Sequence, residues 1–136
     1  DITIMSRTGL ESLVRTLAME VELCNRYGNS RPEEGGEHFF AYAIEPHLRH
    51  TTHGELVGLG ILVTAHMQGQ SWQNMREFMD TIGMCYRPKG ISAHLITETL
   101  KTMPSYVKKY NLRYSIWHEY VYDEPNVQQF LSTLSI

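Results

Sequence analysis

The sequence has 136 residues, of which 42% are hydrophobic and 20% charged, and its net charge is -3. This composition is typical of one globular domain and excludes a mainly disordered chain. The lack of a basic excess disfavours nucleic-acid binding, and no apolar stretch is long enough for a membrane span. Two cysteines without a CxxC pair predict no disulfide framework and a reducing, cytoplasmic setting.

The first predicted helix covers residues 9–27. Thr8 and Glu11 have the spacing of a capping box, apolar residues recur at helical spacing behind them, and Gly28 follows as a stop signal. A second helix is predicted over 33–45, because its apolar residues again recur at helical spacing before a proline.

The third predicted helix, 53–70, is apolar on nearly all sides, as expected of a buried central helix. Gly58 and Gly60 lower its helix propensity, which predicts close packing against another backbone or a ligand. Further helices are predicted over 71–82, 92–103, 104–110 and 126–136, with 112–122 partly extended or loop. The sequence therefore predicts a single all-α domain over residues 1–136, a bundle of six to seven helices.

Two of the seven histidines lie where two predicted helices adjoin. His38 lies on the second helix and His53 opens the third, so antiparallel packing would bring both imidazoles to one point. Neutral imidazole binds zinc or iron(II), and Glu37 or Glu55 is placed to orient a ring from behind. The pair is a candidate metal site, and a purely structural role stays open. The other histidines are expected in a polar link, at the surface or capped against the core: His47, His50, His66, His94 and His118.

A series of short motifs surrounds the histidine pair. They are Arg31-Pro32, Gly36-Glu37-His38, Ala43-Ile44-Glu45, His53-Gly54-Glu55, Val57-Gly58 with Gly60, and Arg113-Tyr114-Ser115-Ile116. In this order they resemble the iron-containing alcohol dehydrogenase and dehydroquinate synthase superfamily, and more narrowly its glycerol-1-phosphate dehydrogenase branch. The resemblance covers most of the chain and rests mainly on the two histidine motifs taken together.

The resemblance implies a two-domain enzyme, with an N-terminal α/β domain that binds NAD(P) and a C-terminal all-helical domain to which this chain corresponds. We therefore expect the nucleotide domain outside this chain, and the chain alone to be inactive. The family's metal lies between the domains. Its two histidine ligands match His38 and His53, and the third ligand, usually Asp, comes from outside the matched stretch. Zinc best fits such a site, with iron or nickel as alternatives.

The implied reaction is hydride transfer between a nicotinamide and a metal-bound secondary alcohol or ketone, the substrate being a polyol phosphate or ketone phosphate. Two positions depart from the family motif: Gly36 replaces a serine, and Tyr42 replaces a histidine that helps with substrate contacts or proton movement. Tyr42 keeps a hydroxyl donor but is a poor base at neutral pH. It is therefore only a candidate catalytic residue. The candidate residues for binding the substrate phosphate are Arg31, Arg49, Lys89 and Arg113, and the sequence does not decide among them.

Two other functions stay open. The chain could be a solitary helical domain that acts as an interaction or regulatory module, because two imidazoles lack the third protein ligand of the usual catalytic zinc site. A dehydroquinate synthase-like lyase or cyclase is the other alternative, and Tyr42 in place of histidine argues against it. We also expect an exposed apolar surface around His38, His53 and the glycines at 54, 58 and 60, which predicts a homo-oligomer.

Overall fold

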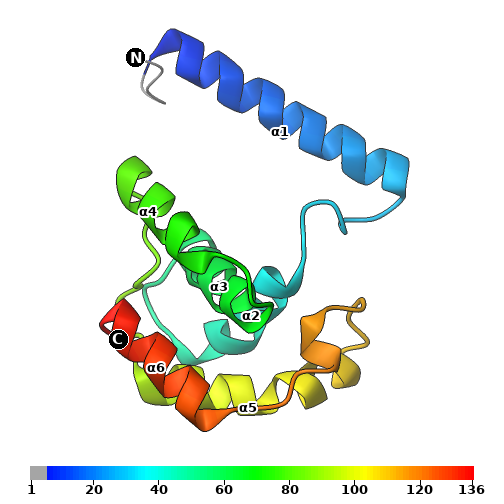
Figure 1. The fold of residues 1–136 in the computed structure, drawn as a ribbon. Helices are drawn as coiled ribbons and strands as arrows, with labels where there is room; N and C mark the ends of the chain where they lie inside the picture. The colour runs from blue at the N-terminus through cyan, green and yellow to red at the C-terminus, as the bar shows by residue number, and fades with distance from the viewer. Residues whose placement is uncertain (1–5) are drawn as a thin grey trace. The chain divides into compact units, whose positions relative to one another are not determined.

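The computed structural model describes residues 6–136. They form six α-helices and two short 3-10 helices, with no strand among the described residues, so the all-α prediction is confirmed (Figure 1). Within the same part of the chain, no helix is both long and apolar enough to cross a membrane. The chain divides into two compact units, Asp1–Gly35 and Gly36–Ile136. That residues 1–136 act as one domain stays a prediction.

The first unit contains α1, Arg7–Tyr27. The side chain of Ser6 accepts a hydrogen bond from the backbone N–H of Gly9 at 3.0 Å. The predicted capping box at Thr8 is therefore wrong, because Ser6 offers the same hydroxyl two residues earlier and the helix begins there. Gly28 ends α1 in the left-handed conformation, with φ of 76°, as its position after the apolar repeat predicts.

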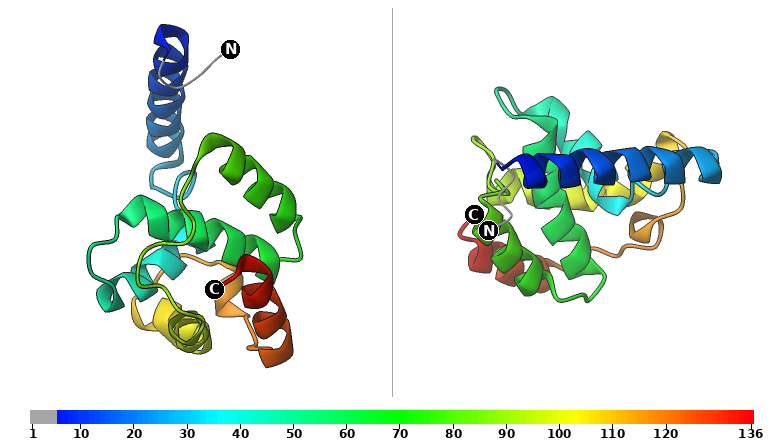
Figure 2. Two further views of the ribbon diagram at one scale, coloured as in Figure 1. Left: turned by 90° about the vertical axis from the view of Figure 1, so that its left-hand side faces the viewer. Right: turned by 90° about the horizontal axis from the view of Figure 1, so that it is seen from above.

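The second unit holds the remaining elements around one hydrophobic core. Within it, α3 packs against both α2 and α4, and α2 also packs against α5 (Figure 2). The largest fully buried side chains include Trp117, Phe40 and Phe130. The elements are α2 (Gly36–Ile44), η1 (Glu45–His47), α3 (His53–Met67), α4 (Trp72–Ile82), α5 (Ala93–Lys109), η2 (Ile116–His118) and α6 (Glu124–Leu134).

The central helix α3 is buried along most of its length, as predicted: eight of its 15 residues are buried. A Cβ atom added to Gly58 would lie 2.6 Å from the backbone oxygen of Cys85, and one added to Gly60 would lie 2.4 Å from that of Glu37. Close packing of α3 against other backbone is therefore confirmed. The expectation that these two glycines lie on an exposed apolar surface is wrong, because both are buried.

Two predicted helices, over 92–103 and 104–110, are one continuous helix, α5. Pro104 lacks the N–H that would donate to the preceding turn, which favours a break. However, Met103 and Val107 on either side of it are fully buried. Packing of both halves against the same core outweighs the missing hydrogen bond, since tertiary contacts supply most helix stability in proteins.

The second and last helices also begin elsewhere than predicted. The N–H groups of Glu33 and Glu34 both donate to the carbonyl of Ser30, so these residues form a turn rather than the start of α2. The last helix, α6, begins two residues earlier than expected, because the side chain of Asp123 accepts from the N–H of Asn126 and caps it.

Candidate functional site

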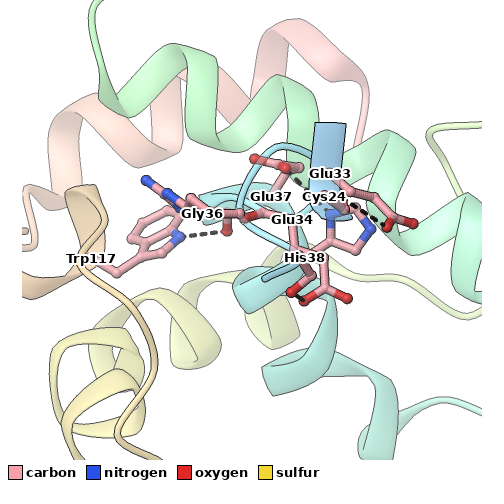
Figure 3. Close-up of polar contacts among 9 residues, drawn as sticks. Cys24, Glu33, Glu34, Gly36, Glu37, His38 and Trp117 are labelled. Carbon is pink, nitrogen blue, oxygen red and sulfur yellow. Dashed lines mark hydrogen bonds and ion pairs between the residues drawn. The ribbon is translucent and has the colours of Figure 1, made fainter. Parts of the chain in front are cut away.

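Two long-range contacts hold the start of α2. The indole Nε1 of Trp117 donates to the carbonyl oxygen of Gly36 at 2.6 Å (Figure 3). The next carbonyl, that of Glu37, lies against Gly60 of α3, where only a hydrogen atom fits. His38 follows directly in the chain. Its backbone is therefore placed by buried contacts between helices.

One face of α2 carries the polar side chains of the site. His38, Tyr42 and Glu45 follow one another at i, i+4 and i+7, the spacing that places side chains on one side of a helix. Glu45 belongs to the 3-10 turn that continues α2, with Pro46 at its first positions. The carboxylate of Glu45 therefore lies on the same side as His38, just beyond the end of α2.

The chain then reverses so that α3 runs antiparallel to α2, which places His53 opposite the end of α2. The link includes His50 in the left-handed conformation, with φ of 63°. Thr52 caps α3 in a capping box with Glu55, which accepts from the Thr52 N–H at 2.8 Å and from its hydroxyl at 3.0 Å. The hydrogen bond from the Thr52 backbone, followed by that from its hydroxyl, lowers the pKa of Glu55.

Three aromatic rings meet where α2 and α3 face each other. The ring centroids of His38 and His53 are 5.6 Å apart, as expected from the antiparallel packing. Tyr42 stacks on His53, with centroids 5.5 Å apart and ring planes at 20°, and lies 6.1 Å from the His38 ring. The side chain of His38 is 17% exposed and that of His53 41% exposed. Solvent therefore reaches the pair mainly from the His53 side.

Each imidazole has a carboxylate at its Nδ1 atom. Glu37 Oε1 lies 3.3 Å from Nδ1 of His38, as the sequence predicts for Glu37. At His53 the neighbour is Glu45, whose Oε2 lies 3.4 Å from Nδ1, whereas Glu55 is engaged in capping α3. Sequence reasoning missed Glu45. The i+7 spacing from His38 was the signal that could have found it.

The other histidines have structural or surface positions, as expected. His66 stacks on Phe130 with centroids 4.4 Å apart and planes at 12°. His118 accepts a hydrogen bond from the Ser115 N–H at its Nδ1 atom, 3.1 Å away, and so caps the second 3-10 turn. The remaining side chains, His47, His50 and His94, are exposed. The pair at 38 and 53 therefore stands apart as the one with converging rings.

The histidine pair has the chemistry of an incomplete metal site. With Nδ1 of each ring beside a carboxylate, Nε2 is the nitrogen left for a metal ion, and imidazole nitrogens of this kind suit a divalent transition metal. Within residues 6–136, no group of three or more His, Cys, Asp or Glu side chains is arranged to hold an ion. Among these residues the pair therefore offers two imidazole nitrogens, one fewer than the three protein ligands of the usual catalytic zinc site.

Other sequence candidates lie apart from the pair or in the first unit. Arg49, Lys89 and Arg113 are exposed, and Arg31 lies in the first unit, where its guanidinium is 3.4 Å from the carbonyl of Glu34. Cys85 is an exposed residue that follows α4. Its carbonyl oxygen lies against Gly58 of α3, and its side chain lies near Glu55.

Comparison with known proteins points to one kind of enzyme, although no family model matches the chain. Over 81 residues it is 37% identical to the glycerol-1-phosphate dehydrogenase [NAD(P)+] of Pyrobaculum aerophilum, covering 55% of this chain and 24% of that protein. The protein of the same name from Thermoplasma acidophilum is 33% identical over 78 residues, 55% of this chain and 22% of its own length. That from Saccharolobus islandicus is 34% identical over 84 residues, or 61% and 24%.

The matched stretch spans about a quarter of the length of these curated relatives. An all-helical chain of this size is consistent with the C-terminal helical domain that the sequence motifs predict. The resemblance is thereby confirmed: this chain is homologous to part of the glycerol-1-phosphate dehydrogenases.

Proposed function

We propose that this chain is the metal- and substrate-binding part of an NAD(P)-dependent dehydrogenase that acts on glycerol 1-phosphate or a similar polyol phosphate. The observation that carries the proposal is the convergence of His38 and His53, with ring centroids 5.6 Å apart. The printed name of the relatives supports the reaction class.

His38 and His53 would hold a divalent metal ion, zinc by preference, through their Nε2 atoms. Such an ion, when bound, supplies Lewis-acid polarisation of the substrate hydroxyl or carbonyl oxygen. Glu37 orients the His38 ring, because its carboxylate lies 3.3 Å from Nδ1. The third protein ligand and the nicotinamide would come from outside the described residues. The proposed role of this chain is therefore to present two fixed nitrogens and a substrate-binding surface.

Tyr42 is the proposed substrate-side residue. Its ring stacks on His53, so it restricts the rotation of that imidazole and carries a hydroxyl donor close to the pair. We expect Tyr42→Phe to leave zinc affinity within about twofold of the original, since the stacked ring is kept and the hydroxyl is not a ligand in this proposal. In an active enzyme that contains this chain, the same change would raise KM for the polyol phosphate.

Calorimetric titration of the purified chain with zinc tests the metal role. We expect weak binding with one ion per chain, because the third protein ligand is not part of the described residues. We expect a loss of at least about tenfold in affinity for His38→Ala and for His53→Ala, because each removes one of the two ligands that the chain offers. His94→Ala is the matched control, since His94 is exposed on α5. Equal affinity in all four proteins, or no zinc binding at all, would contradict the proposal and favour the interaction-module alternative.

An NAD(P)-linked assay with glycerol 1-phosphate tests the division of labour. We expect no turnover by this chain alone, because hydride transfer requires a nicotinamide held against the substrate carbon. The strand, glycine turn and helix that bind a dinucleotide do not occur among residues 6–136. Measurable turnover by the 136-residue chain would show that it carries its own nucleotide site.

A further inference from the structure

We propose that Glu45 is the positioning residue of His53. Its carboxylate accepts the Nδ1–H of that ring and so fixes the tautomer in which Nε2 is unprotonated. The significance of this tautomer for a metal ion rests on the proposed function. The hydrogen bond itself is a property of the metal-free chain.

Two contacts fix the orientation of the His53 ring. Glu45 Oε2 lies 3.4 Å from Nδ1, and Tyr42 stacks against the face of the ring at 20°. Both partners come from the α2 side, whereas His53 is the first residue of α3. The contact between Glu45 and His53, eight positions apart in the chain, therefore joins η1 to α3 and fixes the ring relative to α2.

The contact between Glu45 and His53 matters because it selects which nitrogen of the neutral imidazole carries the proton. Only one ring nitrogen carries a proton, and the hydrogen bond made by one nitrogen decides the state of the other. A carboxylate at Nδ1 selects the Nδ1–H form and leaves the Nε2 lone pair free, the arrangement found behind most metal-binding histidines. His38 has the same arrangement with Glu37. Glu45 therefore completes a matching pair of carboxylates, one behind each ring.

The sequence neighbour Glu55 does not compete for this role. Its carboxylate is bound to the Thr52 N–H and hydroxyl, and these bonds close the capping box of α3. The two carboxylates near His53 thus have separate tasks, which single substitutions can distinguish.

Long-range proton–nitrogen NMR of the metal-free chain, at a pH where the imidazoles are neutral, tests the inference directly. In the unsubstituted chain we expect the Nδ1–H pattern at both His38 and His53. Glu45→Ala should move the His53 nitrogens towards the Nε2–H pattern and leave His38 unchanged. Glu37→Ala is the matched control and should do the reverse. Glu55→Ala should change neither tautomer, although it lowers the melting temperature.

An Nε2–H pattern at His53 in the unsubstituted chain, or an unchanged His53 in Glu45→Ala, would overturn the inference. Circular dichroism of Glu45→Ala establishes that the helices are kept, which alanine favours. A zinc titration of the same variants separates this inference from the proposed function. We expect Glu45→Ala to weaken zinc binding about tenfold. A tautomer change in a chain that binds no zinc would support the inference and contradict the proposed function.

Discussion

The first turn of α3 and its middle turns use glycine in opposite ways. A Cβ atom at Gly54 in the first turn would meet nothing within 4 Å, whereas one at Gly60 would lie 2.4 Å from the carbonyl oxygen of Glu37. The first turn is partly exposed and held by the capping box of Thr52 and Glu55. The middle is held by direct contact between helix backbones.

The hydrogen bonds around His53 and its distance from His38 therefore depend on different parts of α3. His53 lies in the first turn, where side-chain hydrogen bonds can be changed at small cost. Its distance from His38 is set further along, where Gly60 lets α3 approach α2 at Glu37. Changes in the middle of α3 should therefore lower the stability of the fold and also move the two histidines apart. Changes in the first turn should have small effects, and an effect on stability there should not be accompanied by one on the histidine pair.

The largest effect is expected for Gly60→Ala. The added methyl group cannot fit beside the Glu37 carbonyl, and because that atom is backbone, α2 and α3 must separate. We expect a loss of roughly 2–3 kcal/mol in the free energy of unfolding, since overpacking of this kind costs about 1–3 kcal/mol or more and exceeds the helix propensity gained by alanine. Urea denaturation measures it. A loss below about 0.5 kcal/mol would contradict the tight contact inferred here.

Trp117→Phe should have the next largest effect. It removes the indole donor to the buried carbonyl of Gly36 and leaves that carbonyl without the partner that holds the start of α2. That carbonyl keeps the bond from its own helix, so the lost hydrogen bond costs about 0.5–1.5 kcal/mol, to which the loss of packing at the fully buried Trp117 is added. Unfolding by urea again gives the value. A variant as stable as the original chain would show that this hydrogen bond does not hold α2.

Thr52→Ala should cost about 1 kcal/mol, the usual value for loss of an N-cap. The comparison is Ser92→Ala at the start of α5, where the cap side chain accepts from the Leu95 N–H. We expect Thr52→Ala to cost more, because Glu55 also loses a hydrogen bond from the Thr52 hydroxyl. Thermal unfolding of both variants measures the difference, and a larger effect at Ser92 would contradict this order.

The smallest effect, and one of opposite sign, is expected for Gly54→Ala. Position 54 is helical and open, so alanine fits and reduces the entropy of the unfolded chain. We expect a gain of about 0.4–1 kcal/mol, with zinc affinity unchanged. A destabilised Gly54→Ala variant, measured beside Gly60→Ala, would remove the contrast between the two turns of α3.

Much of this contrast could be predicted from the sequence. The apolar residues on all sides of α3 indicate a central helix, and two glycines inside it indicate close approach, although not which atoms they meet. Local patterns were less reliable where two signals compete. Ser6 and Thr8 both offer a hydroxyl for the first cap, and only the structure decides between them. Pro104 is typical of a helix start, yet α5 continues past it because the residues on both sides of it pack in the core.

The histidine pair could be predicted because its two motifs are specific together, and the antiparallel turn between α2 and α3 brings them close. The i+7 spacing from His38 makes Glu45 a candidate partner of His53, but the sequence does not decide between Glu45 and Glu55. Glu55 is close to His53 in sequence, and Glu45 is close to it in space. Which of them contacts the ring depends on which carboxylate caps α3, and the structure shows that this is Glu55.

The central claim is that His38 and His53 bind one metal ion together. Zinc titration followed through the ring nitrogens of both residues by NMR tests it most directly. We predict that the Nε2 signals of the two rings change together, at one midpoint and with one zinc per chain, and that Gly60→Ala weakens both equally. Separate midpoints, or a change at only one of the two rings, would contradict a shared site.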